Sequence, residues 1–270
     1  MTTPQSRSVI DLDSLAVNGR EALTVAHETV AGTTALIVDN VYRDPDYVRG
    51  LALSLSYHRR AGSYPGYFAY LSVSASPVLD LINTLMSDII GAYLTFTFPY
   101  KDDLVFAIVT DRAADLSPGQ RRPHVDDFCD FAALIYLNPP EQCSGGTSFW
   151  RHRPTGMELA PDGADPASIP TREAPSDQPA AGDATGYPSD STEVWELTHV
   201  LPARYNRLVV YNSQLIHSPF YKEDDFGTTL PARRLTQNFY LDRFRFPGAA
   251  RSASRQRLAR TAVDTSGPAG

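Results

Sequence analysis

The N-terminal part of the chain combines one apolar run with two segments of helical periodicity. Residues 34–42 (TALIVDNVY) are rich in β-branched and apolar side chains, which predicts a strand. An Asp-Pro pair then supplies an N-cap residue and a proline at the first helical position, so we expect a helix over 45–57. A Ser-Pro pair repeats this signal before VLDLINTLMSDII, whose apolar residues recur at helical spacing over 77–90. We expect both helices to pack on the outside of a sheet.

From about residue 93 the apolar residues fall into short runs that are separated by turn residues. Many short strands of this kind are typical of a barrel or a sandwich. The sequence therefore predicts a mainly β fold. The strands that we expect span residues 93–98, 104–110, 122–126, 131–138, 147–150, 208–211, 215–218 and 234–241.

The pattern also predicts one main domain with decorations. Residues 1–32 are polar and weakly patterned, and we expect an N-terminal arm there or part of a small N-terminal element. We expect the domain itself to span 33–246 and the C-terminal tail, 247–270, to be peripheral. An inserted loop is expected at about 154–195, because its central block, 161–191, lacks the apolar residues that offset ordering entropy. Two interpretations of this loop remain: a passive surface insertion, or a lid over a site.

Composition narrows the class of protein further. The net charge of −7 argues against a nucleic-acid-binding surface, which usually concentrates Lys and Arg. Cys129 and Cys143 are the only cysteines, so no disulfide framework is expected. The N-terminus lacks the apolar segment of a signal peptide, and no apolar run approaches 18 residues. We therefore expect a cytoplasmic protein without a membrane or nucleic-acid partner.

Candidate chemistry begins with His124 and Asp126, which stand two residues apart in PHVDD. On a strand, residues i and i+2 point to the same face. An imidazole and a carboxylate on one face supply two of the three ligands of a 2-His-1-carboxylate iron site. This short pattern also occurs by chance, so it does not assign a metal on its own.

A third metal ligand has to come from a distant strand, and His217 follows the apolar run RLVVY. A histidine in such a place is more often a core residue. The next segment, however, places Arg234 and Thr236 two apart on an expected strand, so both face one way. A guanidinium beside a hydroxyl suits the binding of a carboxylate inside a barrel. His199 is the competing third ligand, but no R-x-T strand follows it.

This ordered set (H-x-D, a distal histidine, then R-x-T) resembles the iron(II)/2-oxoglutarate-dependent dioxygenase superfamily, particularly its prolyl-4-hydroxylase-like branch. The run FAALIYLNPPEQCSGGTSFW is similar to that branch's strand, Tyr-Leu-Asn turn and Gly-Gly-Thr-x-Phe hairpin. The string WRHRPTGME at 150–158, which continues GGTSF, is similar to a bacterial family of unknown function. The resemblance covers roughly residues 93–242.

The resemblance implies a double-stranded β-helix (a jelly-roll or cupin-like barrel) with N-terminal α-helices that support one sheet. It implies that His124, Asp126 and His217 bind Fe(II), which leaves coordination positions for 2-oxoglutarate and O2. Asp126 favours hydroxylation over halogenation, because the halogenases of this superfamily lack that carboxylate.

The resemblance also implies how 2-oxoglutarate is bound. Arg234 matches the residue that pairs with the distal carboxylate, Thr236 its hydroxyl partner, and Tyr136 a tyrosine that reaches the same carboxylate. The stretch PFYKEDDFGTTLPAR between His217 and the arginine pair is longer than is usual in this branch. The sequence therefore leaves Arg233 open beside Arg234, and we favour Arg234.

The activity implied is hydroxylation of an unactivated C–H bond of a small molecule, either an amino acid or a natural-product intermediate, free or bound to a carrier protein. Two alternatives remain open. One is an iron oxidase or oxygenase that does not use 2-oxoglutarate, and the other is a catalytically inactive, cupin-like binding protein. Arg151 and Arg153 are open to two interpretations, a contact for a substrate anion or part of a solvated charged loop.

Overall fold

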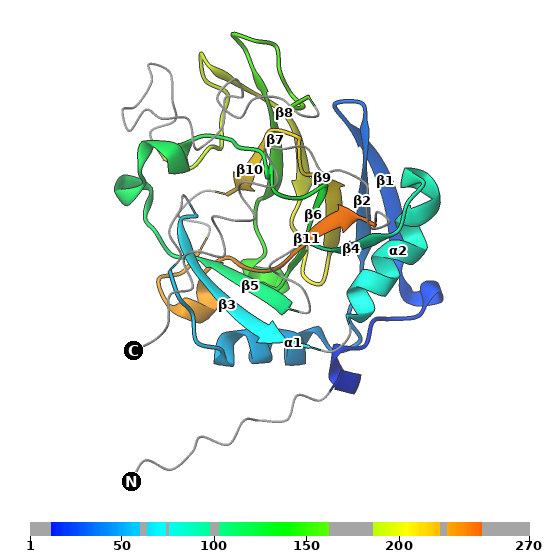
Figure 1. The fold of residues 1–270 in the computed structure, drawn as a ribbon. Coiled ribbons are helices and arrows are strands. Elements are labelled where there is room, and N and C mark those ends of the chain that lie inside the picture. Colours follow the sequence, from blue (N-terminus) through cyan, green and yellow to red (C-terminus); the bar gives the residue numbers. More distant parts are fainter. Residues whose placement is uncertain are drawn as a thin grey trace, which may run out of the picture.

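The computed structural model describes residues 12–59, 64–73, 76–97, 103–161, 186–221 and 226–244. These residues form a large antiparallel sheet and a smaller one (Figure 1). The large sheet runs in the order β1 (Thr24–Val30), β2 (Thr33–Asp39), β9 (Leu208–Asn212), β6 (Phe131–Tyr136), β11 (Leu235–Arg243), β5 (Asp103–Val109) and β3 (Gly66–Ser72), with β4 (Leu94–Phe96) also paired to β11. The small sheet runs in the order β10 (His217–Phe220), β7 (Gly146–His152) and β8 (Trp195–Pro202).

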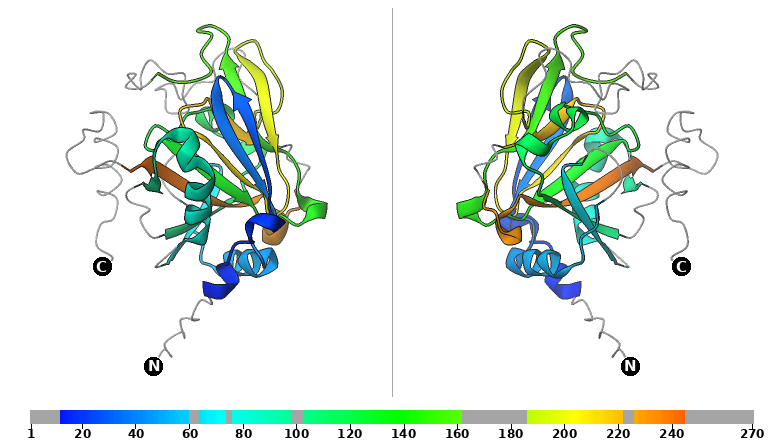
Figure 2. Two further views of the ribbon diagram at one scale, coloured as in Figure 1. Left: turned by 90° about the vertical axis from the view of Figure 1, so that its right-hand side faces the viewer. Right: turned by 90° about the vertical axis from the view of Figure 1, so that its left-hand side faces the viewer.

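The chain passes back and forth between these two sheets. After β5 in the large sheet, the chain pairs with β10 through an isolated bridge at His124. It then supplies β6 to the large sheet, β7 and β8 to the small one, β9 to the large, β10 to the small and β11 to the large. This alternation is the strand order of a double-stranded β-helix. The two side views of Figure 2 show the small sheet beside the large one. The expected fold class is confirmed.

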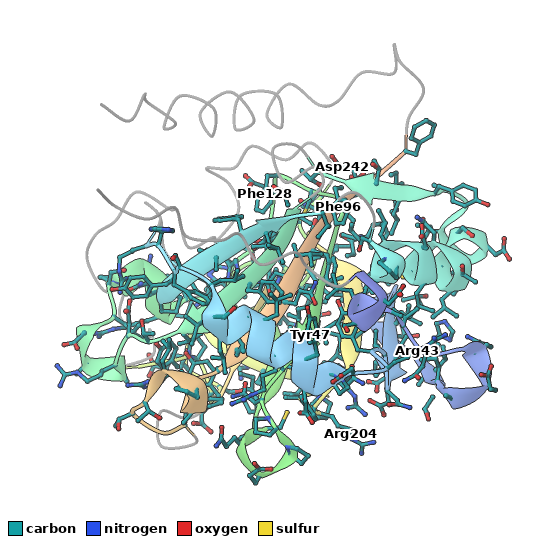
Figure 3. All side chains as sticks on the ribbon, turned by 90° about the horizontal axis from the view of Figure 1, so that it is seen from below. Arg43, Tyr47, Phe96, Phe128, Arg204 and Asp242 are labelled. Atoms are coloured by element: carbon teal, nitrogen blue, oxygen red, sulfur yellow. The ribbon has the colours of Figure 1, made fainter. Side chains whose placement is uncertain are left out.

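Two α-helices support the outer face of the large sheet. They are α1 (Pro45–Ser54) and α2 (Pro77–Ile90), and both begin as expected, with the side chains of Asp44 and Ser76 accepting N-cap hydrogen bonds. In the view from below, α1 lies across the sheet at the labelled Tyr47 (Figure 3). Neither helix has the length and apolarity needed to cross a membrane, and the same holds for every helix in the described ranges. Short 3-10 helices span Leu12–Leu15, Arg20–Ala22, Ala113–Asp115, Pro118–Arg121, Pro140–Gln142 and Leu230–Ala232.

The large sheet has two buried faces, and β11 shows how they differ. Leu235 and Phe239 belong to the outer core, which lies between the sheet and the helices. Thr236 lies between them in sequence and points to the opposite face, which we call the barrel interior. Tyr136 and Tyr211 belong to the apolar cluster of that interior, together with Phe149 of the small sheet. Side chains of both sheets therefore meet in the barrel interior.

The structure contains three strands that the sequence pattern did not predict, and one predicted strand is present only as an isolated bridge. Strands β1, β3 and β8 were not expected, and β1 lies within the segment 1–32 and pairs in register with β2. The expected strand 122–126 is reduced to the bridge at His124. Most of the expected loop block (162–185) and the tail from 245 onward lie outside the described residues, as do residues 1–11.

Candidate metal centre

The structure brings His124, Asp126 and His217 together. The Nε2 atom of His124 lies 3.8 Å from Oδ1 of Asp126, and Nε2 of His217 lies 3.5 Å from Oδ2 of the same carboxylate. The three potential ligand atoms all lie within 4.8 Å of one another. In the described part of the chain, this is the one group of His, Cys, Asp and Glu side chains that could hold a metal ion.

Backbone hydrogen bonds hold the three residues in this arrangement. His124 and His217 exchange two N–H···O bonds, each 2.8 Å long, which join the reduced strand to β10. The amide of Asp126 donates to the carbonyl of Ser213 at 2.9 Å, and the amide side chain of Gln214 donates to the carbonyl of Asp126 at 3.3 Å. The turn 213–216 therefore binds the loop of Asp126 and leads directly into His217. Local backbone pairing, rather than contact between the side chains, sets the geometry.

The ring of His217 is oriented for metal binding. Its Nδ1 lies 2.7 Å from the carbonyl oxygen of Leu215, which can only accept a hydrogen bond, so Nδ1 is the donor and Nε2 is the nitrogen directed toward Asp126. The side chain is almost fully buried. Tyr211 packs against it, nearly edge to face, with ring centroids 4.9 Å apart. Metal-binding histidines commonly have such a backbone acceptor on the second nitrogen.

The donor set and its spacing fit a divalent metal of the first transition series. Two imidazoles and one carboxylate form the facial triad that suits iron(II). Two metal–ligand bonds of about 2.1 Å can join atoms up to roughly 4.2 Å apart, so both measured separations are compatible with one ion. The remaining separation, between the ligand nitrogens of the two histidines, is at most 4.8 Å.

His199, the competing ligand in the sequence, lies elsewhere. Its Nε2 is 2.6 Å from a carboxylate oxygen of Glu28 on β1, and both side chains are partly exposed. The ring of Phe149 lies near both histidines, with centroids 6.3 Å from His199 and 6.5 Å from His217. His199 thus joins β8 to the edge of the large sheet.

Arg234 is a buried cation without a carboxylate partner among the described residues. The residue is 5% exposed, its Nε atom has no hydrogen-bond partner, and no described acidic side chain forms a salt bridge with it. Its guanidinium carbon lies 5.6 Å from the ring centre of Tyr136 and 5.9 Å from that of Tyr221. A buried guanidinium is costly unless an anion pairs with it, and the described surroundings of Arg234 are two aromatic rings.

Thr236 and Tyr136 lie on the same face of the sheet as Arg234. The two residues are direct cross-strand partners on β11 and β6, which places their side chains side by side. The Tyr136 hydroxyl shares a 2.9 Å hydrogen bond with the Thr147 hydroxyl, and burial raises the pKa of Tyr136. Either hydroxyl can be the donor, so the Tyr136 proton is available to an acceptor whenever Thr147 donates.

The side chain of Asn138 sets the register at the start of β11. Its amide donates to the carbonyl of Arg233 at 2.8 Å, and its oxygen accepts from the amide of Leu235 at 2.9 Å. The chain is thereby clamped on both sides of Arg234. Arg234 is buried on the interior side, whereas Arg233 is partly exposed. This arrangement favours Arg234 over Arg233 as the interior cation.

A residue that the sequence reasoning missed is Tyr211 on β9. It is 3% exposed, it contacts His217, and it is the cross-strand partner of Ala132 on the interior face of β6. The alternation of side chains along a strand could have indicated its direction, because Val209 and Tyr211 face the side opposite to Leu208 and Val210.

The charged string at 150–158 forms a network of its own. Arg151 contacts Glu158 at 2.5 Å and Glu196 at 3.0 Å, and Arg153 lies 3.7 Å from the same oxygen of Glu196. Since carboxylates of the chain already pair with both arginines, the interpretation as part of a charged loop is favoured. Trp150 is buried beneath this loop in a small apolar cluster on the outer face of the small sheet.

Three kinds of comparison relate the chain to known proteins. A family model described as "Family of unknown function (DUF6445)" matches residues 21–241. No curated protein sequence matches. The solved structure of SnoN, a non-heme alpha-ketoglutarate-dependent epimerase from nogalamycin biosynthesis, aligns with 81% of this chain and 87% of that chain, at 13% identity and a TM-score of 0.40. The solved structure of the Fe(II)/alpha-ketoglutarate-dependent dioxygenase TqaL aligns with 77% of this chain and 78% of that chain, at 13% identity and a TM-score of 0.27.

Proposed function

The chain belongs to DUF6445, a family of unknown function, and we propose that it is an iron(II)- and 2-oxoglutarate-dependent oxygenase of the prolyl-4-hydroxylase-like type. The observation that carries the proposal is a pairing of two features in one barrel interior. One is the cluster of His124, Asp126 and His217. The other is the buried Arg234, which has no carboxylate partner among the described residues.

In this proposal, His124 and His217 bind Fe(II) through Nε2, and Asp126 binds it through a carboxylate oxygen. Three ligands on one side of the ion leave the other side open to a cosubstrate and O2. The Leu215 carbonyl keeps the His217 ring in place whether or not an ion is bound. The hydrogen bonds from the Asp126 amide to Ser213 and from Gln214 to the Asp126 carbonyl hold the loop of Asp126 in the same way.

Arg234 would bind the distal carboxylate of 2-oxoglutarate, with Thr236 and Tyr136 as hydroxyl donors. Charge-assisted hydrogen bonds of this type are strong where water is excluded, and Arg234 is buried among aromatic rings. When bound, the iron and cosubstrate would use O2 to convert a substrate C–H bond to C–OH, with 2-oxoglutarate converted to succinate and CO2. The protein supplies binding, orientation and exclusion of water.

The interior face extends beyond β11 as an apolar wall that would suit a small-molecule substrate. Thr236 pairs with Ala107 of β5, which pairs with Phe68 of β3. Val105 on β5 similarly pairs with Tyr70 on β3. Phe68, Val105 and Ala107 are buried and form one cluster with Tyr70. We propose that an unactivated C–H bond of a small-molecule substrate lies against this wall and is hydroxylated there. The substrate would be an amino acid or a natural-product intermediate, free or bound to a carrier protein, and not a nucleic acid.

A succinate assay tests this function. Purified protein is incubated with Fe(II), 2-oxoglutarate, O2 and a panel of amino acids and natural-product intermediates, and succinate is measured with and without iron. We expect iron-dependent succinate formation that Asp126→Ala abolishes. Substrate oxidation without succinate would point instead to an iron enzyme that does not use 2-oxoglutarate. Metal binding without any oxidation would favour a cupin-like binding protein.

A further inference from the structure

We propose that Tyr211 is a positioning residue whose hydroxyl donates a hydrogen bond to the carboxylate that a 2-oxo acid places on the metal, at the opposite end of the ligand from Arg234. This inference rests on the proposed function. It assigns the two ends of the ligand to two different groups of the protein. The ligand class would then be a 2-oxo acid with a second, distal carboxylate.

The position of Tyr211 supports this role. The residue lies on the interior face of β9, and its ring packs against the metal-binding side of the fold, 4.9 Å from the His217 ring and 5.2 Å from the Phe149 ring. Those two rings hold the Tyr211 side chain from the small sheet. The phenol is therefore confined between the two sheets, next to a proposed metal ligand.

The surroundings of the hydroxyl agree with this position. Burial raises the pKa of Tyr211 well above its usual value, and the Asp126 carboxylate raises it further, whereas Arg234 acts in the opposite direction. Asp126 and Arg234 are thus both near enough to act on the phenol.

The hydroxyl also lacks a partner. Tyr211 is 3% exposed, and no hydrogen bond to its hydroxyl exists in the described ranges, which include every residue of the cluster around it. Buried phenol groups normally find an acceptor. Tyr136, the other tyrosine in this cluster, shares its hydrogen bond with Thr147. Arg234 is also buried, and its Nε atom has no acceptor. A dianion with a carboxylate at each end would supply an acceptor to both Tyr211 and Arg234.

The test compares two ligands that share the metal-binding end. 2-Oxoglutarate has a distal carboxylate and 2-oxobutyrate has none, and both are titrated calorimetrically into the Mn(II)-loaded protein without O2. Tyr211→Phe should weaken both ligands by a similar factor, about 10- to 100-fold, as expected for a lost hydrogen bond to a charged group. Arg234→Ala should weaken 2-oxoglutarate strongly and 2-oxobutyrate little. Tyr42→Phe removes a buried hydroxyl from the outer core and serves as the control, with both affinities unchanged.

The outcomes separate this inference from the proposed function. If the wild-type protein binds both oxo acids and Tyr211→Phe binds them equally well, the role of Tyr211 is wrong and the proposed function stands. If Tyr211→Phe weakens only 2-oxoglutarate, the tyrosine acts at the distal end and the inference also fails. If the wild-type protein binds Mn(II) but neither oxo acid, both the inference and the proposed function are overturned. Mn(II) affinity should not change in Tyr211→Phe, because the remaining ring still packs against His217; a loss of metal affinity would indicate a structural role instead.

Discussion

The Nε2 atom of His217 lies 3.5 Å from the Oδ2 atom of Asp126, although the two residues lie far apart in the sequence. The turn that precedes β10 accounts for this distance. Ser213 accepts a hydrogen bond from the amide of Asp126, and His217 pairs with His124 through two backbone hydrogen bonds. The three side chains are therefore brought together before any ion binds, and the geometry is set mainly by the backbone.

We predict that His217→Ala abolishes the binding of one equivalent of Fe(II) and that His199→Ala retains it. His217 directs Nε2 toward Asp126, whereas His199 pairs with Glu28 at the edge of the barrel. Metal content after anaerobic reconstitution, measured by elemental analysis, gives the answer. Loss of the metal from the His199→Ala protein would identify a different third ligand.

Arg234→Ala should raise the dissociation constant of 2-oxoglutarate steeply and leave metal affinity nearly intact. Removal of one partner of a buried charged pair typically costs about 2–5 kcal/mol, on the order of 30- to 4,000-fold in affinity. Arg233→Ala is the matched control, because Arg233 is partly exposed and Asn138 contacts only its backbone carbonyl. Calorimetric titration of both Mn(II)-loaded variants distinguishes them. Equal damage from Arg233→Ala would mean that the interior cation is misassigned.

Gly145→Ala should destabilise the fold more than Gly32→Ala. Both glycines have a positive φ, +72° and +78°, and a left-handed backbone costs an alanine about 1–2 kcal/mol. A Cβ atom at Gly145 would also lie 1.8 Å from the carbonyl oxygen of Phe220 on β10, while at Gly32 it would meet nothing within 4 Å. Urea unfolding of both variants measures the difference. Equal losses would show that β7 and β10 can separate at little cost.

The ion pair between Asp39 and Arg207 should make a pH-dependent contribution to stability. The Arg207 hydrogen bond lowers the pKa of Asp39, and the two side chains are only 15% and 13% exposed. A lowered folded-state pKa stabilises the fold above the unfolded pKa of about 3.9, and this stabilisation is lost as the pH falls further. At pH 7, Asp39→Asn should lower the free energy of unfolding by about 1–3 kcal/mol, and the difference should shrink below about pH 4.

The matched control for this prediction is Arg204→Ala. Arg204 also contacts Asp39, at 3.1 Å, but its side chain is 67% exposed, so its loss should change stability little. Unfolding experiments at pH 7 and pH 3.5 on both variants test the assignment. A constant difference between wild type and Asp39→Asn across this range would rule out ionisation of Asp39 as the cause.

The strands that the sequence reveals best are those in the middle of the sheets. The buried runs of β6 and β9 were expected, because strands with a neighbour on each side carry continuous apolar residues. The unexpected strands β1, β3 and β8 all lie at sheet edges. β1 is mostly exposed and β8 is mostly partly exposed, so polar residues interrupt the alternation of apolar and polar positions. β3 carries the aromatic residues typical of strands, and that signal was present in GYFAYLS.

The sequence predicts those parts of the candidate site in which the spacing of neighbouring residues determines the direction of their side chains. The spacing of His124 and Asp126 and that of Arg234 and Thr236 each predict a shared direction, and the structure places each pair on one side. The sequence does not predict contacts between side chains of the two different sheets. Tyr211 reaches His217 only because β9 and β10 face each other across the barrel interior, and no sequence pattern specifies that distance.

The central claim, that one barrel interior binds both iron(II) and 2-oxoglutarate, is tested most directly by an anaerobic absorption titration. The protein is loaded with Fe(II) and titrated with 2-oxoglutarate, and the visible charge-transfer band of an iron-bound 2-oxo acid is recorded. We predict a saturable band at one equivalent for the wild-type protein. The band should be absent in His217→Ala and should require much more ligand in Arg234→Ala. Iron binding by the wild-type protein without any band at saturating 2-oxoglutarate would contradict the account.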